Sequence, residues 1–518
     1  MSLHDARAVD LLDQLRNKQV SSAEIVRALI ARRDAVGRKT NAIVVTMDET
    51  ALAAADPLDA RRARGEDVGA LGGLPITIKE NIEVAGTPST LGVESRRAYR
   101  GKTDAVTVRL LKEQGAIPIG KTNIPQTLIA METTNHVYGT CNNPWAHERT
   151  PGGSSGGEAA ALASGQSVLG VGTDIGGSVR IPAGYTATVA LKPTLNRWSN
   201  RGSIGLLAGQ ELVRSQIGPM ARCVDDLVLL FRAIDTPRHA ALDPECAPIT
   251  MGDPAGVAVR GIRVGVYEDD GYVTPCATSR RAVREAAEIL RRAGATIVEF
   301  TPPHASEHYL LMAAGLSADG MEVMDAALGK DPVIAPVALN RRLGSSPRAL
   351  LRQLSRLARA AGEKRLADIL AVAGKKSVAE VWGLARERTA MQRDELDAWN
   401  AERLDLVLCP ATATPAPQHG STGDFTAAAV YTTRYNLLNL PAGVLPITRV
   451  RADETERREK ADRLDKKVAQ IQRGSAGLPI GVQLVGRPWR EEVVLAAMKA
   501  VEAEATRGSE FPSVPIDG

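Results

Sequence analysis

Apolar and polar positions at the start of the chain repeat with the period of an α-helix. Leu11, Leu12 and Leu15 fall on one face of such a helix. Ser21 and Glu24 have the spacing of a capping box, in which two side chains satisfy backbone N–H groups at the start of a helix. The N-terminal part is therefore predicted to be helical, with a second helix beginning after Ser21.

From Gly72 onward, short apolar runs alternate with helical segments and glycines. Asp104 is expected to cap a helix that stops at Gly115, and the strand-like sequence AIPIG follows at once. Strand-like sequence returns at residues 477–486, GLPIGVQLVG. This alternation predicts an α/β sandwich.

Residues 303 to about 400 lack the strand pattern and are predicted to be helical. One helical face there carries four leucines flanked by arginines: Leu350, Leu351, Leu354 and Leu357, with Arg348, Arg352, Arg356 and Arg359. Two interpretations stay open. The first, which is the usual case, is a core-packing stripe beneath a solvated basic face, and the second is a basic amphipathic helix on a membrane surface.

Composition narrows the class of protein. The 518 residues carry 64 Lys+Arg against 60 Asp+Glu, a balance that argues against nucleic-acid binding by bulk electrostatics. Five cysteines without a CxxC pair indicate a reducing compartment. The sequence shows neither a signal peptide nor an apolar run of about 18 residues, so the expected location is the cytoplasm. The stretch from Arg451 to Arg473 is dense in charge and is expected to be an exposed helix or loop.

Two short patterns match known signatures without the context that those signatures need. Residues 115–122, GAIPIGKT, fit the phosphate-binding loop, but the intervening residues resemble a strand. Residues 304–308, HASEH, fit a zinc-site pattern, but seven histidines in the chain supply no clear cluster of further ligands. Neither nucleotide nor zinc is expected, and His304 and His308 are expected to lie on a surface helix.

Two nucleophile candidates remain as alternatives. Residues 152–156 fit the G-x-S-x-G elbow of the α/β-hydrolases, although the residues before them make a poor strand. Cys141 near His136 is a second candidate, supported by spacing alone.

A larger constellation is formed by two glycine-serine clusters, residues 152–157 and 176–178, with a predicted helix and strand between them. Consecutive N–H groups beside a serine suit the binding of an oxyanion. Upstream, Lys79 follows an apolar run, where burial would disfavour its charged form and allow it to act as a base. Taken singly, a flexible glycine loop and a strand-end lysine would be the simpler explanations.

Four motifs occur in order along the chain: GLPITIK, PGGSSGG, GTDIGGSVRIPA and ALKPT. Together they closely resemble the amidase signature family, with Ala190 where the last motif usually has glycine. Later stretches resemble the fatty acid amide hydrolase branch; they cover residues 209–222, 404–410, 435–448 and 477–492. The resemblance extends over roughly residues 8–505.

This resemblance implies an amidase-signature α/β/α sandwich with a central mixed β-sheet. It also implies one domain over residues 1–518, with a signature core at about 70–240, a helical insert or cap at about 303–400 and a charged surface stretch at 451–474. The insert is expected to cover the active-site mouth or to touch anionic lipid weakly.

Roles follow from the resemblance residue by residue. Ser178 is the expected nucleophile, Ser154 the bridging serine and Lys79 the base of a Ser-Ser-Lys triad that works through an acyl-enzyme. The bridging serine of this family usually follows a cis peptide bond, which here would be Gly153–Ser154. The expected oxyanion hole consists of the backbone N–H groups of Ile175, Gly176, Gly177 and Ser178. No metal or organic cofactor is implied.

The expected substrate is a small-molecule amide with a hydrophobic, fatty-acyl or aryl, acyl group. The expected lining of the acyl pocket is Leu128, Ile129, Met131, Leu206 and Leu207. Hydrolysis of aryl amides, esters or carbamates (urethanes) stays open, because these reactions share the acyl-transfer chemistry.

More distant alternatives come from other members of the same family. One is the amidase subunit of a tRNA-dependent amidotransferase, and another is a catalytically dead scaffold, against which the presence of Lys79, Ser154 and Ser178 argues. The insert favours the stand-alone branch. No nucleic-acid partner and no spanning membrane segment are expected. Weak peripheral membrane contact through residues 340–377, which contain neither Trp nor Phe, and a homodimer remain open.

Overall fold

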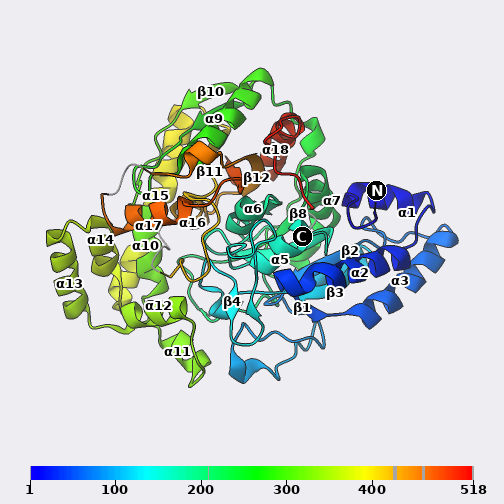
Figure 1. Cartoon of the computed structure of the whole chain (residues 1–518), viewed down its shortest axis with the longest axis horizontal. Coiled ribbons are helices and arrows are strands. Elements are labelled where there is room, and N and C mark those ends of the chain that lie inside the picture. Colours follow the sequence, from blue (N-terminus) through cyan, green and yellow to red (C-terminus); the bar gives the residue numbers. More distant parts are fainter. Residues whose placement is uncertain (1, 208, 424–428, 458–460, 516–518) are drawn as a thin grey trace.

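The computed structural model describes residues 2–207, 209–423, 429–457 and 461–515 (Figure 1). Within these residues, 11 strands form one mixed sheet in the order β1-β3-β2-β6-β8-β7-β12-β13-β11-β9-β10. Its strands are β1 (Ile43–Thr46), β2 (Pro75–Lys79), β3 (Ile117–Thr122), β6 (Leu169–Asp174), β7 (Val189–Lys192), β8 (Gln216–Ala221), β9 (Arg263–Val266), β10 (Thr296–Glu299), β11 (Leu406–Pro410), β12 (Ala442–Arg449) and β13 (Pro479–Gly486). A separate hairpin pairs β4 (Thr134–Asn135) with β5 (Gly139–Thr140).

Helices cover the sheet and extend beyond it. They are α1 (Ala8–Arg16), α2 (Ser22–Thr40), α3 (Asp48–Ala63), α4 (Val106–Glu113), α5 (Gly156–Ala163), α6 (Arg180–Thr186), α7 (Val224–Ile234), α8 (Arg238–Leu242), α9 (Ala277–Arg292), α10 (Glu307–Leu316), α11 (Glu322–Leu328), α12 (Ala335–Ser345), α13 (Arg348–Ala360), α14 (Lys364–Val372), α15 (Val378–Ala401), α16 (Val430–Leu437), α17 (Arg463–Gln472) and α18 (Glu491–Ala505). The predicted α/β architecture with a central mixed sheet is confirmed, as one large domain.

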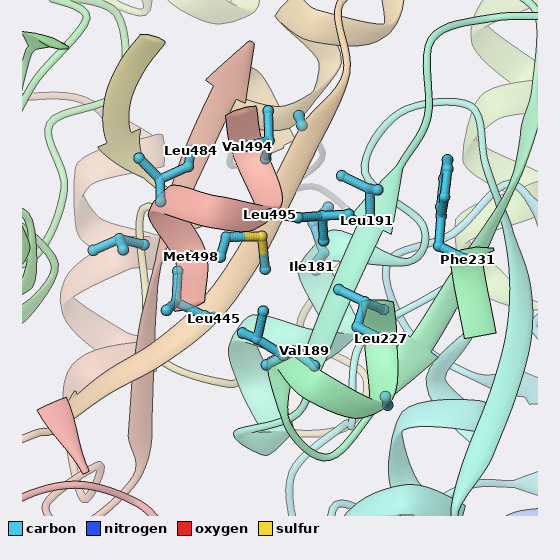
Figure 2. Close-up of a cluster of buried hydrophobic side chains, with 14 of the residues drawn as sticks. Ile181, Val189, Leu191, Leu227, Phe231, Leu445, Leu484, Val494, Leu495 and Met498 are labelled. Atoms are coloured by element: carbon cyan, nitrogen blue, oxygen red, sulfur yellow. The ribbon is translucent and has the colours of Figure 1, made fainter. Parts of the chain in front are cut away.

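The central strands are buried on both faces. Strand β2 runs parallel to β3 and β6, whereas β6 and β8 are antiparallel. Every residue of β2, β3 and β6 is buried, as expected for strands covered on both faces, and the polar residues at their carboxyl ends are buried with them. On the other half of the sheet, α18 lays Val494 and Met498 against Leu445 and Leu484 (Figure 2).

Most of the predicted N-terminal elements are present. Leu11, Leu12 and Leu15 are buried on α1, and Ser21 forms the capping box with Glu24.

The expected helix cap at Asp104 is wrong. Helix α4 begins at Val106, and no side chain caps it. The Asp104 carboxylate instead accepts the backbone N–H of Ala85 at 2.9 Å and pairs with Lys112 at 2.8 Å. The Asp104 carboxylate therefore binds the backbone N–H of Ala85, from a distant loop, instead of the N–H groups at the start of α4.

Helices α10 to α15 confirm that residues 303 to 400 are helical. In Figure 1 the labels α11 to α14 lie on the side of the molecule opposite to α1, α2 and α3. The expected core-packing stripe is correct for Leu351, which is 2% exposed, but not for the other leucines, which are 40% to 66% exposed: Leu350, Leu354 and Leu357. Within the described residues, that face of α13 is only partly covered.

The charged stretch that follows Arg451 is less exposed than predicted. Within it, α17 buries Val468 and Ile471, and Asp465 is held by an ion pair with Arg457. Its charges are therefore partly internal. Across the described residues, no helix is long and apolar enough to span a bilayer.

Candidate active site

Lys79 ends the central strand β2 and is enclosed on every side. Its side chain is fully buried, between the neighbouring strands and α5. Its Nζ atom lies 2.7 Å from Ser154 Oγ, 2.8 Å from Thr173 Oγ1 and 3.2 Å from the Thr173 carbonyl oxygen. Burial lowers the pKa of Lys79 to about 7, although the carboxyl groups of Asp174 and Glu158 act in the opposite direction. A neutral amine is therefore accessible near neutral pH.

Ser154 sits in the loop that leads into α5. Its peptide bond with Gly153 is cis, as predicted, and a Cβ atom at Gly153 would come within 2.5 Å of the Ala130 carbonyl oxygen. The next residue, Ser155, donates its backbone N–H to the carbonyl oxygen of Ser178 over 3.0 Å. This bond joins the two glycine-serine clusters into one site.

Ser178 lies in a tight loop that follows β6. The Asp174 carboxylate shapes this loop, because it accepts the backbone N–H of Gly177 at 2.7 Å and pairs with the fully buried Arg180. Burial acts to raise the pKa of Asp174, but the Arg180 guanidinium holds it well below its usual range. Gly177 has a φ of 122°, and a Cβ atom there would lie 2.2 Å from Thr432 Oγ1. Only glycine fits this position.

The expected set of oxyanion donors is altered by this loop. Because the Gly177 amide already donates to Asp174, it is directed at the protein and not at a substrate. Ile175, Gly176 and Ser178 all border the cavity at this site. The Ser178 hydroxyl makes no hydrogen bond to Ser154 or to any other of the described residues.

A cavity of about 430 Å³ opens at Ser178. Four of the five residues expected to contact substrate line this cavity; they are Leu128, Ile129, Met131 and Leu207. Leu206 does not line it but packs into the neighbouring apolar cluster, next to Leu91 and Val93.

The helical insert supplies much of the remaining wall, through residues that no motif marks: Met312, Leu316, Met321, Met324, Leu339, Leu343 and Ile369. Gln126 holds the insert in place. Its amide donates to the Pro332 carbonyl oxygen at 2.8 Å and accepts the backbone N–H of Ile334 at 2.9 Å. These groups meet only when the insert folds back over the loop that follows Gln126, so the sequence offered no signal for them.

Charged side chains border the same cavity. They come from α14 and α17 and the residues that precede these helices: Glu363, Arg365, Asp462, Arg463 and Lys467. Arg365 forms an ion pair with Asp462. The cavity thus combines an extended apolar wall with a charged border.

The alternative nucleophiles lack the geometry that they require. Ser154 has Lys79 as its partner and no histidine, and a loop rather than a strand precedes it, so the α/β-hydrolase elbow is wrong. Cys141 is fully buried, and burial raises the pKa of its thiol. Within the described part of the chain, Cys141 makes no hydrogen bond to His136.

Among the described residues, the segments that match the phosphate-loop and zinc-site patterns form neither kind of site. Residues 117–122 of the phosphate-loop match form β3. His304 contacts Asp394 at 2.7 Å, while His308 is fully buried on α10 beside the Val430 carbonyl oxygen, which corrects the expected surface location.

Known proteins resemble this chain over most of its length. The family model named Amidase matches residues 24–495. Fatty-acid amide hydrolase 1 of Sus scrofa is 34% identical over 95% of this chain and 84% of its own length. A glutamyl-tRNA(Gln) amidotransferase subunit from Anaeromyxobacter sp. (strain K) is 32% identical over 94% of each chain. A solved fatty acid amide hydrolase structure superposes with a TM-score of 0.83 at 27% identity, over 97% of this chain and 85% of that one. The chain therefore belongs to the amidase signature family and is an amide hydrolase that resembles the fatty acid amide hydrolases over nearly its whole length.

Proposed function

We propose that this enzyme cleaves the C–N bond of amides with a hydrophobic acyl group, through an acyl-enzyme on Ser178 and a Ser-Ser-Lys triad. One observation carries the proposal. A fully buried Lys79, whose pKa burial lowers to about 7, lies 2.7 Å from Ser154 Oγ beside the cavity that Ser178 lines.

The contacts of Lys79 allow its lone pair to face Ser154. A neutral amine has two N–H donors and one lone pair. The Thr173 carbonyl oxygen can only accept, so it takes one N–H, and the Thr173 hydroxyl oxygen takes the other. The lone pair is then left for the O–H of Ser154, and Lys79 becomes the base for that hydroxyl.

The relay runs in both directions. As Ser178 Oγ bonds to the substrate carbonyl carbon, its proton passes to Ser154 and the Ser154 proton passes to Lys79. The amides of Ile175, Gly176 and Ser178 stabilise the oxygen anion of the tetrahedral intermediate. Reversal of the relay protonates the leaving amine as the C–N bond breaks, and water then releases the acyl group by the same steps.

The apolar wall of the cavity favours a fatty-acyl or aryl group on the acyl side. The similarity to fatty-acid amide hydrolase 1 points the same way. Aryl amides, esters and carbamates are the neighbouring candidates, because each can acylate Ser178 by the same steps.

A fluorophosphonate probe tests the assignment directly. It should label Ser178, Ser178→Ala should abolish labelling and turnover with normal folding, and Ser155→Ala should retain labelling. Label on Ser154 or Ser155 would overturn the triad. A panel of substrates varied in acyl length and in leaving group, as amide, anilide, ester and carbamate, then defines the preference.

A second candidate is the amidase component of an amidotransferase, which the 32% identity to such a component favours. Copurification of partner chains, with activity that depends on them, would support it. A cytoplasmic location, weak peripheral membrane contact and a homodimer are further proposals. The exposed Leu350, Leu354 and Leu357 motivate the membrane contact, and vesicle sedimentation with and without their replacement by serine tests it.

A further inference from the structure

Glu158 is a buried carboxyl group that the proposed mechanism does not use. It lies in the first turn of α5, four residues after Ser154, and is fully buried. Its two oxygens accept hydrogen bonds from the Thr77 hydroxyl and, at 2.9 Å, from the Thr122 hydroxyl. Across the described residues, no Lys or Arg lies within ion-pair distance of it. A carboxyl group placed in this way is costly to bury unless a nearby charge compensates it.

The register of the sheet places Glu158 beside Lys79. Thr77 and Lys79 are two residues apart on β2 and therefore share one face of the sheet. Thr122 is directly opposite Lys79 in the parallel pairing of β2 and β3, so its side chain lies on that face too. Because Glu158 binds both threonines, its carboxyl group lies on the same face as the Lys79 amine, beyond ion-pair distance but near enough to act on its charge.

Charges around Lys79 come from two elements. The carboxylate of Asp174, at the end of β6, acts on Lys79, but it also interacts with the positive charges of Arg180 and Lys192. Glu158, on α5, has Lys79 as its charged neighbour. Burial raises the pKa of Glu158 to about 8, although the two threonine hydroxyls and the ammonium form of Lys79 act in the opposite direction. The carboxyl group is therefore most readily ionised when Lys79 carries the proton.

We propose that Glu158 is a positioning residue that acts through Lys79, as the buried counter-charge that stabilises the ammonium form of Lys79 during acyl transfer. This inference rests on the proposed function, since it requires Lys79 to be the base. Burial alone would make the amine too weak a base to accept the Ser154 proton. A neighbouring carboxylate restores its basicity, so that Lys79 can take that proton and later return it to the leaving amine.

Glu158→Gln tests this, because glutamine keeps the shape and can still bind both threonine hydroxyls. The measurement is the second-order rate constant for fluorophosphonate labelling of Ser178 as a function of pH. That reaction needs the base but does not need protonation of a leaving amine. Loss of a close carboxylate lowers the pKa of a lysine, by about 1 to 3 units. We expect the acidic limb of the profile to move to lower pH by about one unit or more, with a lower plateau.

Two variants serve as controls. Glu491 is also fully buried and accepts a backbone N–H, from Thr194 at 2.7 Å, but it faces Arg197, so Glu491→Gln should leave the limb in place. Thr122→Val removes one donor to the Glu158 carboxylate and keeps the carboxyl group. It should move the limb in the same direction by a smaller amount.

An unchanged limb, or a limb moved to higher pH, in folded Glu158→Gln would overturn the inference. Thermal unfolding establishes that the variant is folded, and if it is not, an unchanged limb in Thr122→Val overturns the inference instead. The two levels of failure can be separated. Full labelling of Lys79→Ala would refute the proposed triad, whereas an inactive Lys79→Ala with an unmoved limb in Glu158→Gln would refute only the role of Glu158.

Discussion

Replacing Lys79 by methionine measures the cost of burying the amine that we propose as the base. Methionine fills a similar volume and carries no charge. In the folded enzyme, the pKa of this lysine falls from 10.5 to about 7. At about 1.4 kcal/mol per unit, that fall corresponds to about 5 kcal/mol of free energy of unfolding lost at pH 7.

The sign follows from proton binding. The unfolded chain keeps the proton on Lys79 up to pH 10.5, whereas the folded enzyme releases it near pH 7. Between these values the unfolded state binds more protons, so the stability of the wild type rises with pH. Lys79→Met lacks this contribution. Its stability advantage over the wild type should therefore shrink by about 3 kcal/mol between about pH 7 and 9.5. The lost hydrogen bonds to Ser154 and Thr173 reduce the advantage by an amount that does not vary with pH.

The assay is urea unfolding of both proteins at a series of pH values, read as the difference in free energy of unfolding. Lys121→Met is the matched control, because Lys121 is buried on the adjacent strand and burial lowers its pKa to about 8. The difference in free energy of unfolding between Lys121→Met and the wild type should begin to shrink about one pH unit higher than for Lys79→Met. The fluorophosphonate probe should still label Ser178 in this variant. If the wild type and Lys79→Met gave parallel curves across this range, Lys79 would be protonated in the fold and could not act as the base.

Three further substitutions test the loop, the insert and the cavity. Gly177→Ala should lower kcat/KM at least about 100-fold, because the new methyl group meets Thr432 Oγ1 and displaces the loop that carries Ser178. Gly205→Ala is the control and should leave kcat/KM unchanged, because, outside its two neighbours in the chain, no described residue lies within 4 Å of the added methyl group. Gln126→Leu removes both hydrogen bonds to the insert and should lower the free energy of unfolding by about 1 to 3 kcal/mol, measured by thermal or urea unfolding. It should also raise KM for substrates with long acyl chains. An unchanged KM would show that the insert holds its position without these bonds. Met321→Ala enlarges the cavity, so the acyl-length optimum of kcat/KM should move to longer chains, and an optimum that stays fixed would place the acyl group elsewhere.

The parts of the molecule that the sequence predicted are those whose geometry is decided locally. The capping box at Ser21 and the strand after Gly115 depend on neighbours in the chain. Lys79, Ser154 and Ser178 could be named because each lies in a motif, and the fold then brings them to one site.

Contacts between distant segments could not be predicted in this way. The carboxylate of Asp104 binds Ala85 and Lys112, and a local pattern cannot show this competition with a helix cap. The exposure of Leu354 depends on how far other helices cover it, and the described residues leave it 40% exposed. The wall residue Met321 joins the site only through the return of the insert.

The wall of the cavity has a consequence for how this enzyme can change. The proposed reacting groups come from residues 79–178, while much of the apolar wall comes from residues 309–369, a stretch of chain that takes no part in the proposed proton relay. Substitutions in the second stretch can alter which acyl groups fit without disturbing the first. New substrate preferences can therefore arise by mutation of the insert alone, and exchanging this stretch between relatives is a direct route to altered selectivity with the reaction steps preserved.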